Sequence, residues 1–320
     1  MAGYVVRRVF MGIIVVIIVT ILVFLLIRLL PGDPLLMYLT QQQFRDTQFD
    51  PAQLAQLQAK YGLDKPLPMQ YISWIADMFH GDLGESINLK QPVSKLIAQR
   101  MPVTLHLSII GAIFATIVGI GFGIICAIRR GTWLDTVLTF LANIGITIPS
   151  FWAAILLIYL FGLKLHWVPI AGYTSPFEDF WLNTRQIILP IFCMSLFGLA
   201  SNTRLTRSCM LEVIAQDYIR TAWAKGLKER VIILRHTVKN GLIPLIANMG
   251  FLVAGLFGGS VIIETLFNIN GVGRLLTTAL LGQDYMIVQA STLLFVGLIT
   301  FSNIVVDISY GWLDPRIRYD

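Results

Sequence analysis

The class of fold is decided by residues 9–30, which read VFMGIIVVIIVTILVFLLIRLL. As a helix rising 1.5 Å per residue, this run reaches about 33 Å, enough to cross a hydrocarbon core of about 30 Å. The basic pair Arg7 and Arg8 in front of it is typical of a secretory signal. However, the apolar run is longer than in most signals and no A-x-A cleavage site follows. We therefore expect an uncleaved first transmembrane helix.

Apolar blocks of similar length recur along the 320 residues. The chain is 56% apolar and 13% charged, with a mean hydropathy of +0.73, whereas a typical soluble domain is about 25% charged. This composition excludes a single soluble globule and predicts an all-α polytopic membrane protein with six transmembrane helices. The predicted spans are residues 9–30, 103–128, 137–163, 187–202, 242–266 and 287–310.

The basic residues between these spans predict the orientation. With the N-terminus inside, fourteen Lys and Arg fall on the inner side and three on the outer side. This count leaves out the outer segment 31–102, because long loops cross the membrane largely regardless of charge. Both termini are therefore predicted to be cytoplasmic. The net charge of +6 then reflects orientation rather than a basic face on a soluble module, and no nucleic-acid partner is expected.

The spans divide the chain into four regions: residues 1–30, the outer segment 31–102, the transmembrane core 103–310 and the tail 311–320. The outer segment contains two amphipathic stretches, 51–60 and 69–79, with apolar residues at helical spacing. We predict a small helical extracytoplasmic subdomain between the first two spans. It either shields the ends of the spans or docks a soluble partner.

The cytoplasmic loop 203–241 holds eight of the 24 basic residues. Residues 210–226 have good helix formers with apolar positions every three to four residues, and Gly226 is placed to end that helix. A second helical segment is expected from Glu229 to Asn240. Because small residues gather at the end of the first helix, where a partner's backbone could approach closely, we favour partner docking over contact with anionic lipid. These small residues are Thr221, Ala222, Ala224 and Gly226.

The sequence holds no motif for a metal site, a disulfide or a nucleotide site. Its histidines are dispersed, and Cys126, Cys193 and Cys209 lie far apart in sequence. No G-x-x-x-x-G-K-[ST] loop is present, so ATP hydrolysis would have to come from another subunit. The glycines at 119–123 and 255–259 lie inside spans, where small residues favour close helix packing.

Polar residues inside the spans are candidates for a path or for bonds between helices. Two carboxylates, Glu264 and Asp307, lie near opposite ends of spans, which argues against an intramembrane aspartyl protease. Asp307 is predicted to form a helix-end or interfacial pair, and Arg28 to reach the outer interface. The residues predicted to line a path or to bond neighbouring helices are Asn143, Ser150, Asn202, Asn248 and Ser260.

The cytoplasmic loop resembles the signature loop of the membrane subunits of ATP-binding-cassette (ABC) importers, which reads Glu-Ala-Ala, three residues, then Gly. Here the register gives Arg220-Thr-Ala222 and then Gly226, so the Glu and the first Ala are missing. Residues 217–226, with 235–236 and 240–244, are similar to the variant found in dipeptide, oligopeptide and nickel permeases. Further stretches resembling that narrower family are PGDP at 31–34, YGLDKP at 61–66, GDLGES at 81–86, RMPVT at 100–104, RGTWLD at 130–135, GVGR at 271–274, DY at 284–285, VQA at 288–290 and DPRIR at 314–318.

This resemblance implies the type I ABC importer permease fold in a bacterial inner membrane. The subunit would form half of a translocation pathway as a heterodimer with a second permease, the chain itself being the first of the pair. Two cytoplasmic ATPases would bind ATP and Mg, this chain holding no cofactor and no catalytic residue, and an extracytoplasmic solute-binding protein would deliver the substrate. The ATPase-coupling residues implied are Asp217, Tyr218, Thr221, Ala222, Lys225 and Gly226.

The sequence allows alternatives for the cargo and for the class of protein. Peptides are the expected cargo, and nickel or another metal chelate is the alternative within the same architecture. From another class, a secondary transporter or channel is disfavoured because no inverted internal repeat with paired broken helices is visible. An assembly or scaffold protein without transport of its own also remains open.

Overall fold

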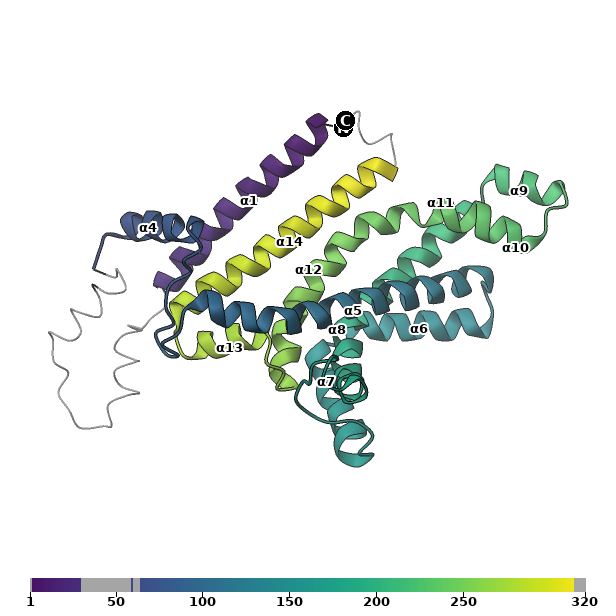
Figure 1. Cartoon of the computed structure of the whole chain (residues 1–320). Coiled ribbons are helices and arrows are strands. Elements are labelled where there is room, and N and C mark those ends of the chain that lie inside the picture. Colours follow the sequence, from purple (N-terminus) through teal and green to yellow (C-terminus); the bar gives the residue numbers. More distant parts are fainter. Residues whose placement is uncertain (1, 30–58, 60–63, 314–320) are drawn as a thin grey trace. The chain divides into compact units, whose positions relative to one another are not determined.

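The computed structural model describes residues 2–29, 59 and 64–313, and its regular elements there are helices, with one isolated β-bridge between Glu85 and Pro92 (Figure 1). The α-helices are α1 (Ala2–Leu29), α4 (Leu67–Phe79), α5 (Val93–Ile128), α6 (Trp133–Thr147), α7 (Ser150–Leu157), α8 (Phe180–Ile214), α9 (Asp217–Ala224), α10 (Glu229–Val231), α11 (Lys239–Gly241), α12 (Ile243–Leu266), α13 (Val272–Leu281) and α14 (Tyr285–Leu313). Two π-helical stretches are η1 (Ile158–Lys164) and η2 (Ile232–Val238).

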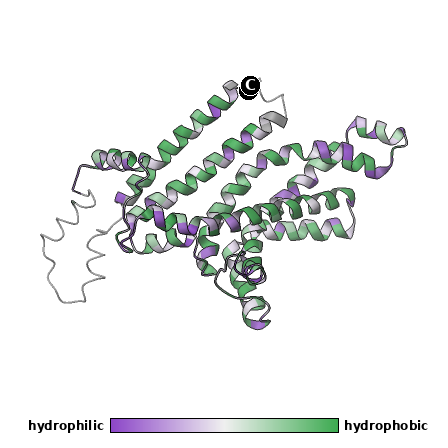
Figure 2. Ribbon diagram, in the orientation of Figure 1, coloured by the Kyte–Doolittle hydropathy of each residue, from purple (hydrophilic) through white to green (hydrophobic). Residues whose placement is uncertain are grey.

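Five helices of the described chain are long and apolar enough to cross a membrane, namely α1, α5, α8, α12 and α14. A sixth span results if α6 is counted together with α7 and η1. Apolar residues dominate these helices, and hydrophilic residues gather at the tip formed by α9 and α10 (Figure 2). The prediction of an all-α polytopic membrane protein is confirmed.

The predicted third span, 137–163, is not one straight helix. The axis bends by 107° between α6 and α7. The cause is Pro149, which lacks an N–H and disfavours helical backbone in the residue before it. Accordingly, Ile148 is extended, with φ −75° and ψ 124°. A new helix begins at Ser150, directly after the proline.

The predicted fourth span, 187–202, is the middle of a much longer helix. The 35 residues of α8 continue to Ile214, about three turns past the predicted end. Pro190 lies inside α8 without ending it. The extra turns are helical because they are packed: Thr203, Thr206 and Met210 are buried. The segment after Ile214 therefore follows a packed helical extension of a span.

The chain divides into two compact units. The first contains residues 104–269 together with the two ends of the chain, 1–12 and 299–320. Within it, α6 and α12 pack against α8, and α7 contacts both α8 and α12 (Figure 1). The ends of the chain meet at an ion pair between Arg8 and Asp307, with 3.3 Å between Nη1 and Oδ2. The predicted interfacial pair of Asp307 is thereby confirmed.

Glycines pack α5 against α8, as predicted for residues 119–123. A Cβ at Gly119 would lie 2.7 Å from the Leu199 carbonyl oxygen, and one at Gly123 would collide with Thr206. The same prediction is wrong for contacts that α12 makes within this chain. A Cβ at Gly255, or at either glycine of the 258–259 pair, would meet no atom within 4 Å in the described structure.

The second unit contains residues 13–103 and 270–298. The amphipathic stretch 69–79 forms α4, as predicted, while the stretch 51–60 lies outside the described residues except for Ala59. Three rings join α4 to α1: Phe24 packs against Tyr71 and Trp74, with centroids 5.4 and 6.2 Å away. The Tyr71 hydroxyl also lies 2.9 Å from the hydroxyl of Thr20. The helix α4 is therefore held against the first helix.

Candidate functional site

The predicted coupling loop forms a small folded element, called here the coupling segment (residues 215–241). It consists of α9, a turn, and the continuous run of α10, η2 and α11. Its core is the buried cluster of Ile219, Ala222 and Ile232, against which Val213 of α8 packs. The second predicted helix, Glu229 to Asn240, is confirmed, with a π-helical centre. The first is interrupted at residues 215–216, so α9 is a separate short helix.

The turn after α9 explains why a glycine stands at position 226. Gly226 has φ +71°, a left-handed conformation that residues with a Cβ rarely adopt. Its N–H donates to the Trp223 carbonyl at 2.9 Å, and the N–H of Leu227 donates to the Ala222 carbonyl at 3.3 Å. These two bonds form a Schellman motif, which ends a helix and satisfies its last carbonyls. A Cβ at Gly226 would meet nothing within 4 Å, so the backbone conformation selects the glycine.

Five of the six predicted coupling residues are exposed, and one is not. Ala222 is buried inside the segment, 8% exposed, where it packs instead of facing solvent. Tyr218 accepts a hydrogen bond from Asn240 Nδ2 at 3.1 Å, which joins α9 to α11. The exposed residues are Asp217, Tyr218, Thr221, Lys225 and Gly226. The segment therefore presents one face of α9 and its C-terminal turn.

A buried ion pair that the sequence analysis missed fixes the base of α6 on α8. Asp135 takes two hydrogen bonds from the Arg207 guanidinium, at 2.8 and 2.9 Å, and a third from the Gly131 N–H at 3.0 Å. Gly131 has φ +78°, which turns the chain so that its N–H points at the carboxylate. The sequence signal for this ion pair is the RGTWLD stretch at 130–135. Its Asp was given no partner, because Arg207 was interpreted only as a basic residue that sets the orientation.

A cavity of about 370 Å³ lies where α6 breaks into α7. Residues 146–150 line it together with α8 and α12. Of the predicted pathway residues, Ser150 and Asn248 line this cavity, and Asn248 donates to the side chain of Asn202 at 3.1 Å. Asn202 is buried and also donates to the Ala115 carbonyl of α5 at 3.4 Å.

The structure does not bring the other two predicted pathway residues to this cavity. Asn143 is exposed one turn before the break, and its carbonyl accepts a bond from Thr147. Ser260 is fully buried and donates to the carbonyl of Phe257 within its own helix. In contrast, Gly255 and Gly259 line the cavity. These two glycines of α12, where an added Cβ would meet no atom of the described chain within 4 Å, therefore lie beside the predicted path.

Comparison with known proteins shows the family to which the chain belongs. Residues 119–319 match the family described as binding-protein-dependent transport system inner membrane component. Residues 1–108 match the N-terminal region of membrane components of such systems. The chain belongs to this family. It is therefore a multi-pass membrane subunit that serves transport rather than catalysis and works with a binding protein, as the loop motifs had suggested.

Two relatives match along their whole length. A Brucella abortus protein, provisionally named as a peptide transport system permease, is 42% identical over 324 residues, all of both chains. The oligopeptide transport system permease protein AppB of Bacillus subtilis is 38% identical over 322 residues, again all of both chains. A solved structure of the methionine ABC transporter MetNI, in inward-facing conformations, matches with a TM-score of 0.57 at 16% identity, over 68% of this chain and 96% of that one. That likeness shows the type I importer permease fold.

The second compact unit (residues 13–103 and 270–298), called here the outer unit after the predicted orientation, joins two of the family-like stretches that are far apart in sequence. Asp284 is 1% exposed and accepts hydrogen bonds from the Ser86 hydroxyl at 2.5 Å and from the Asn88 N–H at 3.1 Å. Ser86 ends the GDLGES stretch, and Asp284 stands just before α14. Asn88 Nδ2 also donates to the Gly282 carbonyl at 2.9 Å. The two stretches thus form one buried polar junction.

A third buried carboxylate, Glu264, lies near the end of α12 and receives a hydrogen bond from Thr104 Oγ1 at 2.7 Å. Both residues are fully buried. Thr104 ends the RMPVT stretch at 100–104, so a fourth family-like stretch has a structural partner. Glu264 therefore joins α12 to α5.

Proposed function

We propose that this permease forms half of the translocation pathway of an importer for short peptides, paired with a second, similar permease. Two cytoplasmic ATPases bind ATP and Mg and contact the coupling segment, while a binding protein delivers the peptide on the outer side. Both termini lie in the cytoplasm. Relatives named as peptide or oligopeptide permeases support the cargo.

The observation that carries the proposal is the continuity between the coupling segment and the cavity. The same helix, α8, lines the cavity with residues 193–201 and ends at the coupling segment. At the other end of the coupling segment, Gly241 of α11 lies against Met210 of α8, because an added Cβ would be 3.2 Å from Met210 Sδ. The residues that lead into α12 are therefore packed against α8. A displacement of α9 by an ATPase is therefore transmitted through α8 and α12 to the walls of the cavity, because packed helices move as bodies.

Replacing Thr221 with Arg tests the docking face. Thr221 is exposed on α9, so the change adds bulk and charge without disturbing the buried cluster. We expect recruitment of the ATPases to membranes, and peptide uptake, to fall at least about tenfold, since a misplaced charge in an interface costs several kcal/mol.

The matched control is Thr278→Arg, at an exposed threonine of α13 in the outer unit. It should leave recruitment unchanged. Unaltered recruitment and uptake in the Thr221→Arg protein would refute the assignment of the coupling segment.

A further inference from the structure

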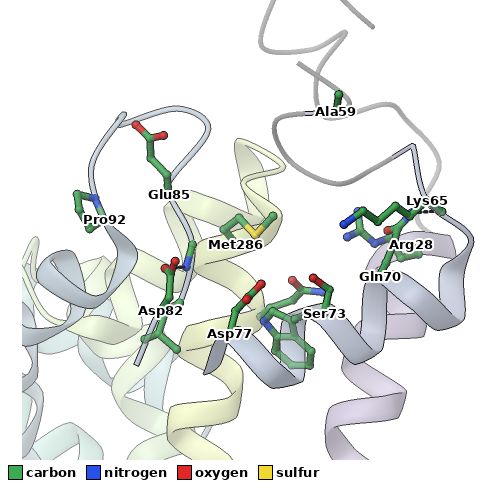
Figure 3. Close-up of a pocket in the computed structure, with 14 residues that line it drawn as sticks. Arg28, Ala59, Lys65, Gln70, Ser73, Asp77, Asp82, Glu85, Pro92 and Met286 are labelled. Carbon is green, nitrogen blue, oxygen red and sulfur yellow. Dashed lines mark hydrogen bonds between the residues drawn. The ribbon is translucent and has the colours of Figure 1, made fainter. Parts of the chain in front are cut away.

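The outer unit contains a second cavity, of about 570 Å³, which the proposed pathway does not use. It lies among α1, α4, the GDLGES stretch and α14 (Figure 3). Its volume falls in the range of about 300–1,000 Å³ that is usual for small-ligand sites. All the residues that line it belong to the same compact unit.

The walls of this cavity carry opposite charges at separate places. Figure 3 shows Lys65 and Arg28 together near Gln70, and Asp82 with Glu85 away from them, with Asp77 between the two groups. Neither Asp77 nor Asp82 forms an ion pair with Lys65 or Arg28 among the described residues. Asp77 and Asp82 are therefore not neutralised by Lys65 or Arg28 across the cavity.

Two donors at the cavity have no acceptor among the described residues. Gln289 is 1% exposed, yet its Nε2 lacks a hydrogen-bond partner. The same holds for Nε of Arg28, whose guanidinium is held over the rings of Phe24 and Tyr285, at 5.2 and 5.6 Å. A buried donor without an acceptor is destabilising, so these groups favour a ligand that brings acceptor oxygens.

The acidic side is suited to an ammonium group rather than to a metal ion. In the part of the chain that the structure describes, no three acidic, His or Cys side chains come close enough to hold a metal. Asp82 is oriented by a hydrogen bond from the Gly84 N–H at 2.8 Å, where Gly84 has φ +82°. A carboxylate held in a fixed orientation is a good partner for a charged N–H donor.

We propose that this outer cavity binds a small zwitterionic ligand, a short peptide with free ends, its carboxylate toward Arg28 and Lys65 and its ammonium toward Asp77 and Asp82. The choice of a peptide rests on the proposed function. The site is separate from the cavity at the α6–α7 break, so it holds a peptide on the outer side before entry to the pathway.

The test uses the whole importer in nanodiscs of phosphatidylglycerol, without the binding protein, titrated calorimetrically with three probes. The probes are trialanine, its N-acetyl form and its C-terminal amide. Trialanine should bind saturably, and each blocked form at least about fivefold more weakly, the size expected for losing one partly exposed charge pair.

Variants assign each end of the peptide. Asp77→Asn with Asp82→Asn should abolish the preference for the free ammonium, and Lys65→Met the preference for the free carboxylate. Lys65 is exposed, so its replacement does not threaten folding. The control is Lys95→Met, an exposed lysine of the same unit that does not line the cavity.

Three outcomes would overturn the inference. They are equal binding of the three probes, no saturable binding by trialanine, or displacement of trialanine when the nanodiscs contain phosphatidylethanolamine, whose headgroup is also zwitterionic. Peptide uptake by the complete system is measured in parallel. Normal uptake without binding here would reject this site alone, whereas absent uptake would reject the proposed function.

Discussion

At the scale of single residues, two buried carboxylates hold together segments that are distant in the chain. Asp135 binds Arg207 across 72 positions, and Asp284 binds Ser86 across 198 positions. Asp135, in the first turn of α6, also accepts from the Gly131 N–H, and Asp284 also accepts from the Asn88 N–H, so each buried carboxylate has several donors. Such groups stabilise a fold only while all partners are present, because an orphaned charge is costly.

Replacing Asp135 with Asn should destabilise the permease. The side chain keeps its shape but loses its charge, which leaves Arg207 without its counterion. Because Arg207 is about a third exposed, we expect a loss of about 1–3 kcal/mol, less than for a fully buried pair. The measurement is thermal unfolding of the purified importer. The matched control is Asp179→Asn at the N-cap of α8, where Asn caps a helix as well as Asp and stability should not change. Equal melting of both variants would contradict the assigned role.

At the scale of elements, the coupling segment depends on its own small core and on one turn. The helix α9 has only eight residues, too short to be stable alone in water. Its stability comes from the packing of Ile219 and Ala222 on Ile232 and from the Schellman turn at Gly226.

Substitutions at Gly226 test whether the turn after α9 controls the order of that helix. Gly226→Val places a β-branched residue at φ +71° and should expose the amides of α9 to hydrogen exchange, with a cost of about 1–2 kcal/mol. Gly226→Asn should retain most of the protection, because Asn tolerates this conformation. The readout is exchange of peptides covering residues 215–230 in the whole importer. If Val and Asn behave alike, the turn does not control the order of α9.

The elements also show where prediction from sequence succeeds and where it fails. Apolar length located the spans, and the glycine at 226 marked the end of a helix, because both effects are local. The extent of α8 was missed, because its last turns are polar in sequence and are helical owing to tertiary packing of Thr206 and Met210. The 107° bend was also not predicted, because Pro149 indicates a break in the helix but not the angle of that break.

At the scale of the whole molecule, sequence predicted the class and the family but not the assembly of the sites. The pathway candidates were chosen as polar residues in spans, and only Ser150, Asn202 and Asn248 gather at one cavity. Which faces of two helices meet depends on the rotation of each helix about its axis. A span that is apolar on all sides does not show this rotation in its sequence. The outer cavity was not predicted, because its lining comes from four separate stretches of chain.

The predicted orientation can be tested by labelling single cysteines in a background without native cysteine. Thr221→Cys should react with a membrane-impermeant maleimide only in inside-out vesicles, and Phe177→Cys only in intact cells. Both positions are exposed, Phe177 at 98%, so in a permease expressed without its ATPases access is limited by the membrane alone. Because the inner side carries fourteen basic residues against three, we expect nearly complete selectivity. The opposite labelling pattern would invert the topology and remove the coupling segment from the ATPases.

The junction between Ser86 and Asp284 sets an order on biosynthesis. Because 198 positions separate the partners, a growing chain has made most of its spans before this hydrogen bond can close. Until α14 emerges, Ser86 and Asn88 lack the carboxylate that they bind in the finished protein. The outer unit is therefore completed only after residue 284 has emerged, and a chain cut short before that residue leaves Ser86 and Asn88 without their closing contact.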